Sequence, residues 1–113
     1  MRNRPPTDRD RLDHIMDAIE SIEAFTKDLS EEEFMQDSKI CSAVLFQFVI
    51  IGEAVSALSL ELMQKYPYAW HKPRSFRNFI AHEYFGIKME VVWYTIQVQL
   101  PEFKSFIIEI RNS

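Results

Sequence analysis

Four side chains that could cleave a phosphodiester bond lie within eight residues, namely Arg77, Asn78, His82 and Tyr84. Cleaving an RNA backbone without a metal ion requires a base for the 2′-hydroxyl, an acid for the leaving oxygen, and a cation for the charge developing on the phosphate. A histidine can serve as base or acid near neutral pH, and an arginine offers a permanently charged fork that fits a phosphate. The segment 77–84 is therefore the candidate site for this chemistry.

One copy of this segment supplies only part of such a site. On a helix Asn78 and His82 are four residues apart and share a face, whereas Arg77 points to an adjacent face. Asn78 could orient the imidazole or donate to the phosphate, and Tyr84 could bind substrate or be modified itself. Because a concerted reaction is better served by two histidines than by one, we expect a homodimer whose two-fold axis brings two copies together.

The same residue types also allow purely structural roles. Arg77 could pair with a carboxylate, His82 could be an ordinary histidine at a helix end, and Tyr84 could be a half-buried aromatic residue. Four polar residues in eight are not rare, so the residue types alone leave both interpretations open.

Other kinds of chemistry find little support in the sequence. The histidines His14, His71 and His82 are far apart and have neither cysteine partners nor His-Glu-x-x-His spacing, so we expect no metal. There is no glycine-rich phosphate loop and no serine elbow, so we expect no cofactor. The single cysteine, Cys41, lies in an apolar run and is expected to be a buried structural thiol.

Composition and charge restrict the possible partners. The chain has 113 residues, about one domain, and its 13 Lys and Arg against 17 Asp and Glu give a net charge of -4. This balance excludes a global basic field, so we expect no DNA partner, and any RNA must be held locally. Two groups of basic residues could do so, at Arg2, Arg4, Arg9 and Arg11 and, just before the candidate site, at His71, Lys72 and Arg74.

The longest apolar stretch, residues 44–57, is interrupted by Gln47 and Glu53 and is predicted to be too short and too polar to span a bilayer. No apolar segment follows the first residues, so no secretory signal is predicted. We expect a cytoplasmic protein without a membrane partner.

Apolar residues at spacings of three and four predict helices along most of the chain. The first covers about residues 8–28, capped by Thr7 with Asp10, and a short helical turn follows Ser30 and Glu33. A long helix over about 39–65, capped by Ser38, is apolar on so much of its circumference that other helices or a second subunit must cover it.

The candidate site falls on a predicted helix over about 73–84, opened by Pro73 and ended by Gly86 in the left-handed conformation. The last helix, 89–110, should kink or break near Leu100 because of Pro101. No strand is predicted. We therefore expect an all-α, up-and-down bundle of four to five helices forming one domain over 1–113, with a flexible arm at 1–7.

The order of these residues resembles one family. The pattern Arg77-Asn78-x-x-x-His82-x-Tyr84 is similar to the Arg-x4-His-x-Tyr signature of HepT-like toxins in the HEPN superfamily. The resemblance covers about residues 8–110, because further landmarks occur in order: Gly52-Glu53-Ala54, Tyr66-Pro67, Trp70, Phe85-Gly86, Val92-Trp93 and Leu100-Pro101.

The resemblance implies a dimeric helical bundle that cleaves RNA without metal in a cleft between two copies of the motif. It implies that Arg77 and His82 are the catalytic pair, that Asn78 supports them, and that Tyr84 is AMPylated. The AMP would come from ATP through a partner, a minimal nucleotidyltransferase (MNT-type) antitoxin. Two other hypotheses keep the fold without the chemistry: a module that binds the nucleotidyltransferase or a nucleotide, and a purely structural dimeric bundle.

Overall fold

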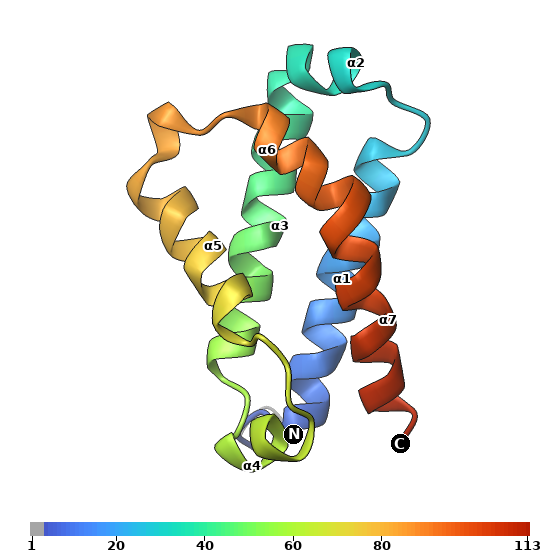
Figure 1. Cartoon of the computed structure of the whole chain (residues 1–113), viewed down its shortest axis with the longest axis vertical. Coiled ribbons are helices and arrows are strands. Elements are labelled where there is room, and N and C mark those ends of the chain that lie inside the picture. The colour runs from blue at the N-terminus through green and yellow to red at the C-terminus, as the bar shows by residue number, and fades with distance from the viewer. Residues whose placement is uncertain (1–3) are drawn as a thin grey trace.

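The computed structural model describes residues 4–113, and the regular elements of this part of the chain are all helical (Figure 1). Its long helical segments run alternately up and down, which confirms the predicted all-α bundle. The long segments are α1 (Asp8–Thr26), α3 (Ser38–Ser56), α5 (His71–His82), and an arm made of α6 (Met89–Tyr94), the π-helical turn η2 (Thr95–Gln99) and α7 (Leu100–Arg111). Short helices connect them at opposite ends of the bundle, α2 (Glu31–Gln36) and α4 (Leu60–Lys65).

The start of α1 and the end of α7 lie at the end of the bundle where α4 is found (Figure 1). Of the basic residues near the amino end, Arg2 lies outside the described residues. Arg4 forms an ion pair with Asp10 of α1 at 3.1 Å.

Side-chain caps fix where the first helices begin. The Thr7 hydroxyl accepts from the backbone N–H of Asp10, and the Asp10 carboxylate accepts from that of Thr7, which confirms the predicted capping box. Ser30 and Glu33 make the same pair of bonds ahead of α2. The predicted cap at Ser38 is wrong.

Asp37 caps α3 instead, because its carboxylate accepts from the backbone N–H of Ile40 at 3.0 Å. Ser38 is then the first residue of the helix. An aspartate is as good a cap as a serine, and here the aspartate comes one residue earlier in the chain.

The predicted long helix over 39–65 is in fact two helices, α3 and α4. Ser59 caps α4, because its hydroxyl accepts from the backbone N–H of Leu62 at 3.1 Å. The carboxylate of Asp8 in turn accepts from both the N–H and the hydroxyl of Ser59, at 2.9 and 2.6 Å. Asp8, at the start of α1, thus stabilises the break between α3 and α4. The local apolar pattern of residues 39–65 does not reveal this contact.

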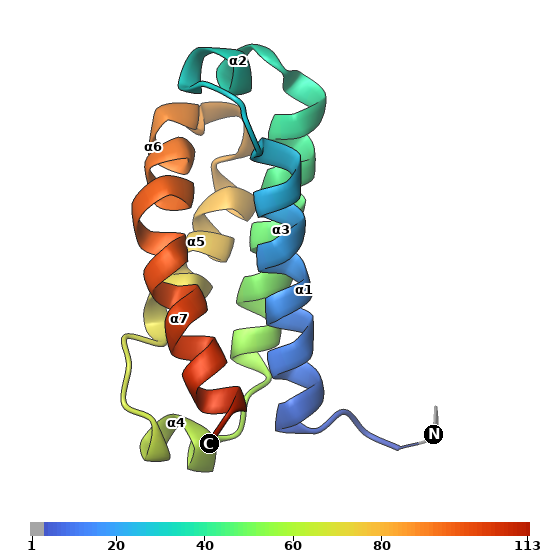
Figure 2. The same cartoon turned by 90° about the vertical axis from the view of Figure 1, so that its right-hand side faces the viewer.

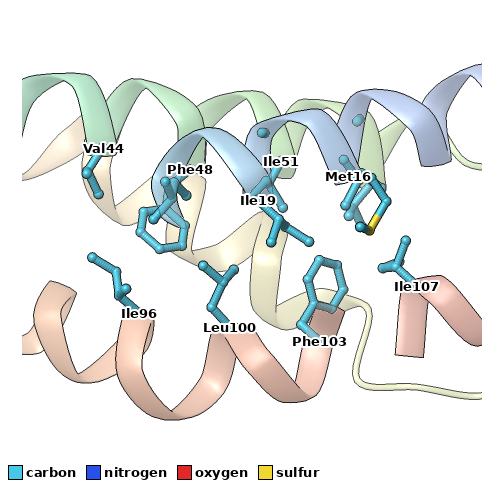
Figure 3. Close-up of a cluster of buried hydrophobic side chains, with 14 of the residues drawn as sticks. Met16, Ile19, Val44, Phe48, Ile51, Ile96, Leu100, Phe103 and Ile107 are labelled. Carbon is cyan, nitrogen blue, oxygen red and sulfur yellow. The ribbon is translucent and has the colours of Figure 1, made fainter. Parts of the chain in front are cut away.

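Helix α3 lies at the centre of the bundle and packs against α1 on one side and α5 on another. Its Val44, Phe48 and Ile51 face residues of the carboxyl-terminal arm (Figure 3), and Figure 2 shows that arm alongside α1 and α3. The core formed in this way includes Leu12, Ile15, Ile19, Ile22, Phe34, Val55, Val92 and Ile107. These contacts explain the apolar circumference of α3.

The prediction that the apolar stretch is too short for a membrane span is not confirmed. Helix α3 has 19 residues and, among the described helices, is the one long and apolar enough to cross a bilayer by length and composition alone. However, 44% of the apolar segment of α3 is buried inside the bundle. A core helix of a globular protein has the same properties.

The last helix is irregular at the predicted place but does not break. Leu100 donates its N–H to the carbonyl of Thr95, five residues back, which is the bond of a π-helical turn. The wider turn directly precedes Pro101, whose ring would clash with the fourth carbonyl back in a regular α-helix. The chain therefore stays helical from Met89 to Arg111.

Cys41 is buried, and its thiol donates to the carbonyl of Phe34 at 3.2 Å. Burial raises the pKa of this thiol, with a smaller contribution in the same direction from the charge of Asp37. Such a thiol is poorly reactive, as expected of a structural cysteine.

Candidate active site on helix α5

The candidate site lies at the end of α5. Helix α5 begins at His71, two residues before the predicted start, so Pro73 falls in its first turn but does not open it. Just before the helix, the indole N–H of Trp70 donates to the carbonyl of Tyr66 at 3.0 Å. The helix ends at His82 rather than at residue 84, and a 3-10 turn, η1 (Tyr84–Gly86), follows. Gly86 has no positive φ, so the predicted left-handed cap is wrong.

Helix α5 packs tightly against α3 at Gly52. A Cβ atom at this position would lie 2.3 Å from Arg77 Cβ, 2.8 Å from Arg77 Cγ and 3.0 Å from the carbonyl oxygen of Pro73. Only glycine leaves room for this contact. The stem of Arg77 is thus held directly against the backbone of α3.

The guanidinium of Arg77 forms an ion pair with Glu53, the only acidic residue of α3. One structural role considered for Arg77, pairing with a carboxylate, is therefore real. Arg77 is 28% exposed and its Nε is buried, so only its outer nitrogens could reach a phosphate. Glu53 was not predicted to pair with Arg77. The signal for this pairing was a single acidic residue next to a glycine in an otherwise apolar helix.

The other motif residues point outward. Asn78 and His82 are exposed on one face of α5, and Tyr84 follows at the start of η1 with 52% of its surface exposed. Arg77 and His82 are five residues apart, which places them about 140° apart around the helix. One chain therefore brings Asn78 and His82 together but leaves Arg77 on the side of α3.

The predicted RNA-binding residues lie on the first turn of the same helix. His71 and Lys72 are exposed, whereas Arg74 is partly buried. By helical spacing, His71 lies on the face of α5 that carries Asn78 and His82. A strand of RNA along this face would pass His71 and Asn78 before it reached His82.

Large apolar side chains are exposed on α5 and η1 and on the following α6 and η2. Val91, Tyr94 and Val98 follow one another at helical spacing on α6 and η2, so they form a single exposed row. The others lie on α5 and η1: Phe79, Tyr84 and Phe85. Clustered apolar exposure of this kind marks a surface that another molecule covers.

Across residues 4–113, no group of three His, Cys, Asp or Glu side chains could hold a metal ion.

Comparison with known proteins identifies the family. The family model described as Ribonuclease HepT-like matches residues 15–110. Over 105 residues the chain is 33% identical to the "Probable ribonuclease HepT" of Thermococcus cleftensis, which covers 92% of this chain and 96% of the relative. It is also 33% identical over 105 residues to a "Putative RNase" of Caldanaerobacter subterraneus subsp. tengcongensis, covering 92% and 94%.

This chain belongs to the HepT-like family of the HEPN superfamily, whose relatives are named as ribonucleases. A "Gamma-glutamylcyclotransferase and putative RNase" of Methanocaldococcus jannaschii is 33% identical over 102 residues, and the chain spans 46% of that protein's length. No solved structure matches the chain at a comparable level of significance.

The contact at Gly52 leads to a first prediction. Gly52→Ala should push α5 away from α3 and lower the free energy of unfolding by about 1–3 kcal/mol, the usual cost of overpacking. Chemical denaturation measures this loss. Gly86→Ala is the matched control, because its Cβ would meet only Glu83 Oε1, at 3.8 Å. Equal stability of the two variants would show that the helices separate without cost.

Proposed function

We propose that this protein is a metal-independent endoribonuclease toxin of a HEPN/MNT toxin–antitoxin system, acting in the cytoplasm. The observation that carries the proposal is the arrangement of the motif: Asn78, His82 and Tyr84 are exposed together at the end of α5, while α3 holds the neighbouring Arg77. The family, whose relatives are named as ribonucleases, supports RNA as the substrate.

In the proposed reaction His82 takes the proton of the 2′-hydroxyl, and the resulting oxygen attacks the adjacent phosphorus. A 2′,3′-cyclic phosphate forms as the bond to the 5′-oxygen breaks, and a protonated histidine donates a proton to that leaving oxygen. The guanidinium of Arg77 stabilises the charge that develops on the phosphate oxygens. Asn78, one turn before His82, orients the imidazole or donates to the phosphate.

The geometry of a single chain favours a site shared between two copies. One chain contributes one motif histidine, and its Arg77 lies about 140° around the helix from it. A two-fold dimer would supply a second histidine and a second arginine to the same phosphate. The exposed apolar row Val91, Tyr94 and Val98 is a suitable surface for this second copy.

Tyr84 provides the proposed means of control. Its exposure leaves the phenol accessible to a nucleotidyltransferase that transfers AMP from ATP. In this transfer the phenol oxygen attacks the α-phosphorus of ATP, pyrophosphate leaves, and the phenol proton is lost to solvent. The added phosphate places negative charge two residues from His82, so it would repel the RNA backbone.

The wild-type chain, incubated with RNA in excess chelator, should cut the RNA and leave ends with 2′,3′-cyclic phosphate. Sedimentation of the same sample should give the mass of a dimer. Activity lost in chelator and restored by a divalent ion would overturn the metal-independent mechanism. A dimer that cuts no RNA under any condition would favour a non-catalytic binding module instead.

A further inference from the structure

A pocket of about 430 Å³ opens beside the motif helix, between α5, α3 and the carboxyl-terminal arm. Its floor is the edge of the core, where Phe48, Ile51, Leu100 and Phe103 lie close together (Figure 3). Helix α5 forms one wall, and η2 with the start of α7 forms the other. The mechanism proposed above uses none of the side chains that line this pocket.

Aromatic rings form much of the pocket lining. Phe76 and Phe79 of α5 lie nearly parallel, with an interplanar angle of 14°, and Phe48 meets Phe76 edge to face. Phe79 is 40% exposed although it is a large apolar residue. Exposed flat rings are the surfaces on which proteins stack unpaired nucleic-acid bases.

Polar groups surround these rings. Ser75 and Gln99 line opposite walls and are exposed, so their hydrogen-bonding groups are available to a ligand. Lys72 brings positive charge to the same pocket, as a phosphodiester requires, and His71 adds a ring that can form a hydrogen bond. Glu102, also exposed in the lining, can accept a hydrogen bond from the exocyclic amino group of a base.

The pocket is also correctly placed relative to the bond that would be cut. Phe79 lies three residues before His82 on the same helix, a rise of about 4.5 Å. Ser75 and His71 continue along the helix toward its beginning. A strand of RNA with its scissile phosphate at His82 would therefore carry a neighbouring base past the opening.

We propose that this pocket binds one base of the RNA next to the cleaved phosphate and sets the base preference of the enzyme. The proposal rests on the ribonuclease function proposed above. Because the carboxylate of Glu102 accepts hydrogen bonds, adenine, cytosine and guanine should be preferred over uracil. The one donor on the pairing edge of uracil, N3–H, lies between two carbonyl oxygens that repel a carboxylate, whereas the other three bases offer an exocyclic amino group. A side chain from a second copy of the protein is the alternative occupant.

Cleavage of a random-sequence RNA pool, followed by sequencing of the new ends, tests this directly. The wild type should disfavour uracil at one position beside the cut. Phe79→Ala should lower cleavage roughly 5- to 100-fold, the usual effect of removing one stacking residue, and flatten that preference. Glu102→Gln should weaken discrimination against uracil. Phe25→Ala, which removes a similarly exposed ring (38%) from α1, should change neither cleavage nor preference.

Two results would overturn the proposal. In the first, Phe79→Ala keeps the wild-type base preference. In the second, it dissociates the dimer in sedimentation, which would show that the partner copy fills the pocket. If the wild type cuts no RNA at all, the proposed function fails. Nucleotide binding then tests by itself whether the pocket accepts a base. Saturable NMR shifts at Ser75 and Gln99 with AMP or CMP, but not UMP, would support a base pocket, and their absence would overturn it.

Discussion

His82→Ala should lower the rate of RNA cleavage by about 10²- to 10⁴-fold, the usual contribution of a general acid or base. The loss of rate should lie at the upper end of this range, because in a symmetric dimer one substitution removes both histidines of the site. The fold should be unaffected, since His82 is exposed and surface substitutions usually change stability by less than about 0.5 kcal/mol. Cleavage of a labelled RNA measures the first effect, and thermal unfolding the second.

His14→Ala is the matched control, because His14 is exposed on α1, away from the motif helix. It should cleave RNA at the wild-type rate. If His82→Ala also retained full activity as a folded dimer, His82 would have no catalytic role, and the structural explanation of the motif would be correct for that residue.

Tyr84→Phe should abolish modification by the nucleotidyltransferase. Phenylalanine keeps the ring but removes the phenol oxygen that would accept the AMP, so no acceptor remains at this position. Incubation of the wild type with the partner and ATP should add the mass of one or more AMP groups, whereas the variant should gain none. In cells the variant should inhibit growth even when the partner is present.

Tyr94→Phe controls for the general loss of a tyrosine. Tyr94 is 56% exposed, close to the 52% of Tyr84, but it lies on α6 outside the motif. This variant should gain AMP as the wild type does. A mass gain that persists in Tyr84→Phe and disappears in Tyr94→Phe would move the modification to α6.

Several features that depend on neighbours in the sequence were predicted correctly, although the caps at Ser38 and Gly86 were not. The caps at Thr7 and Ser30 are bonds between residues three apart, so the sequence alone reveals them. Pro101 likewise acts on the turn that directly precedes it, and the irregularity occurs there as expected. The helical periodicity of apolar residues gave the correct fold class for the same reason.

Features that depend on distant residues could not be predicted in this way. The break between α3 and α4 is stabilised by Asp8, 51 residues before Ser59. The pairing of Arg77 with Glu53 joins residues 24 apart and requires the close approach of two helices at Gly52. The motif spacing indicated the chemistry of the site, but only the packing of α5 shows which face each side chain occupies.

The positions of the two chain ends have a consequence for how this fold can be combined with others. The start of α1 and the end of α7 lie at the end of the bundle where α4 is found, opposite η1, which carries Tyr84 (Figure 1). A domain fused at either terminus would therefore be joined to the bundle at the end opposite the motif. The name of the relative from Methanocaldococcus jannaschii combines a cyclotransferase with an RNase in one protein. The geometry of this fold permits such a fusion. Affinity tags for the experiments above can be attached at either end for the same reason.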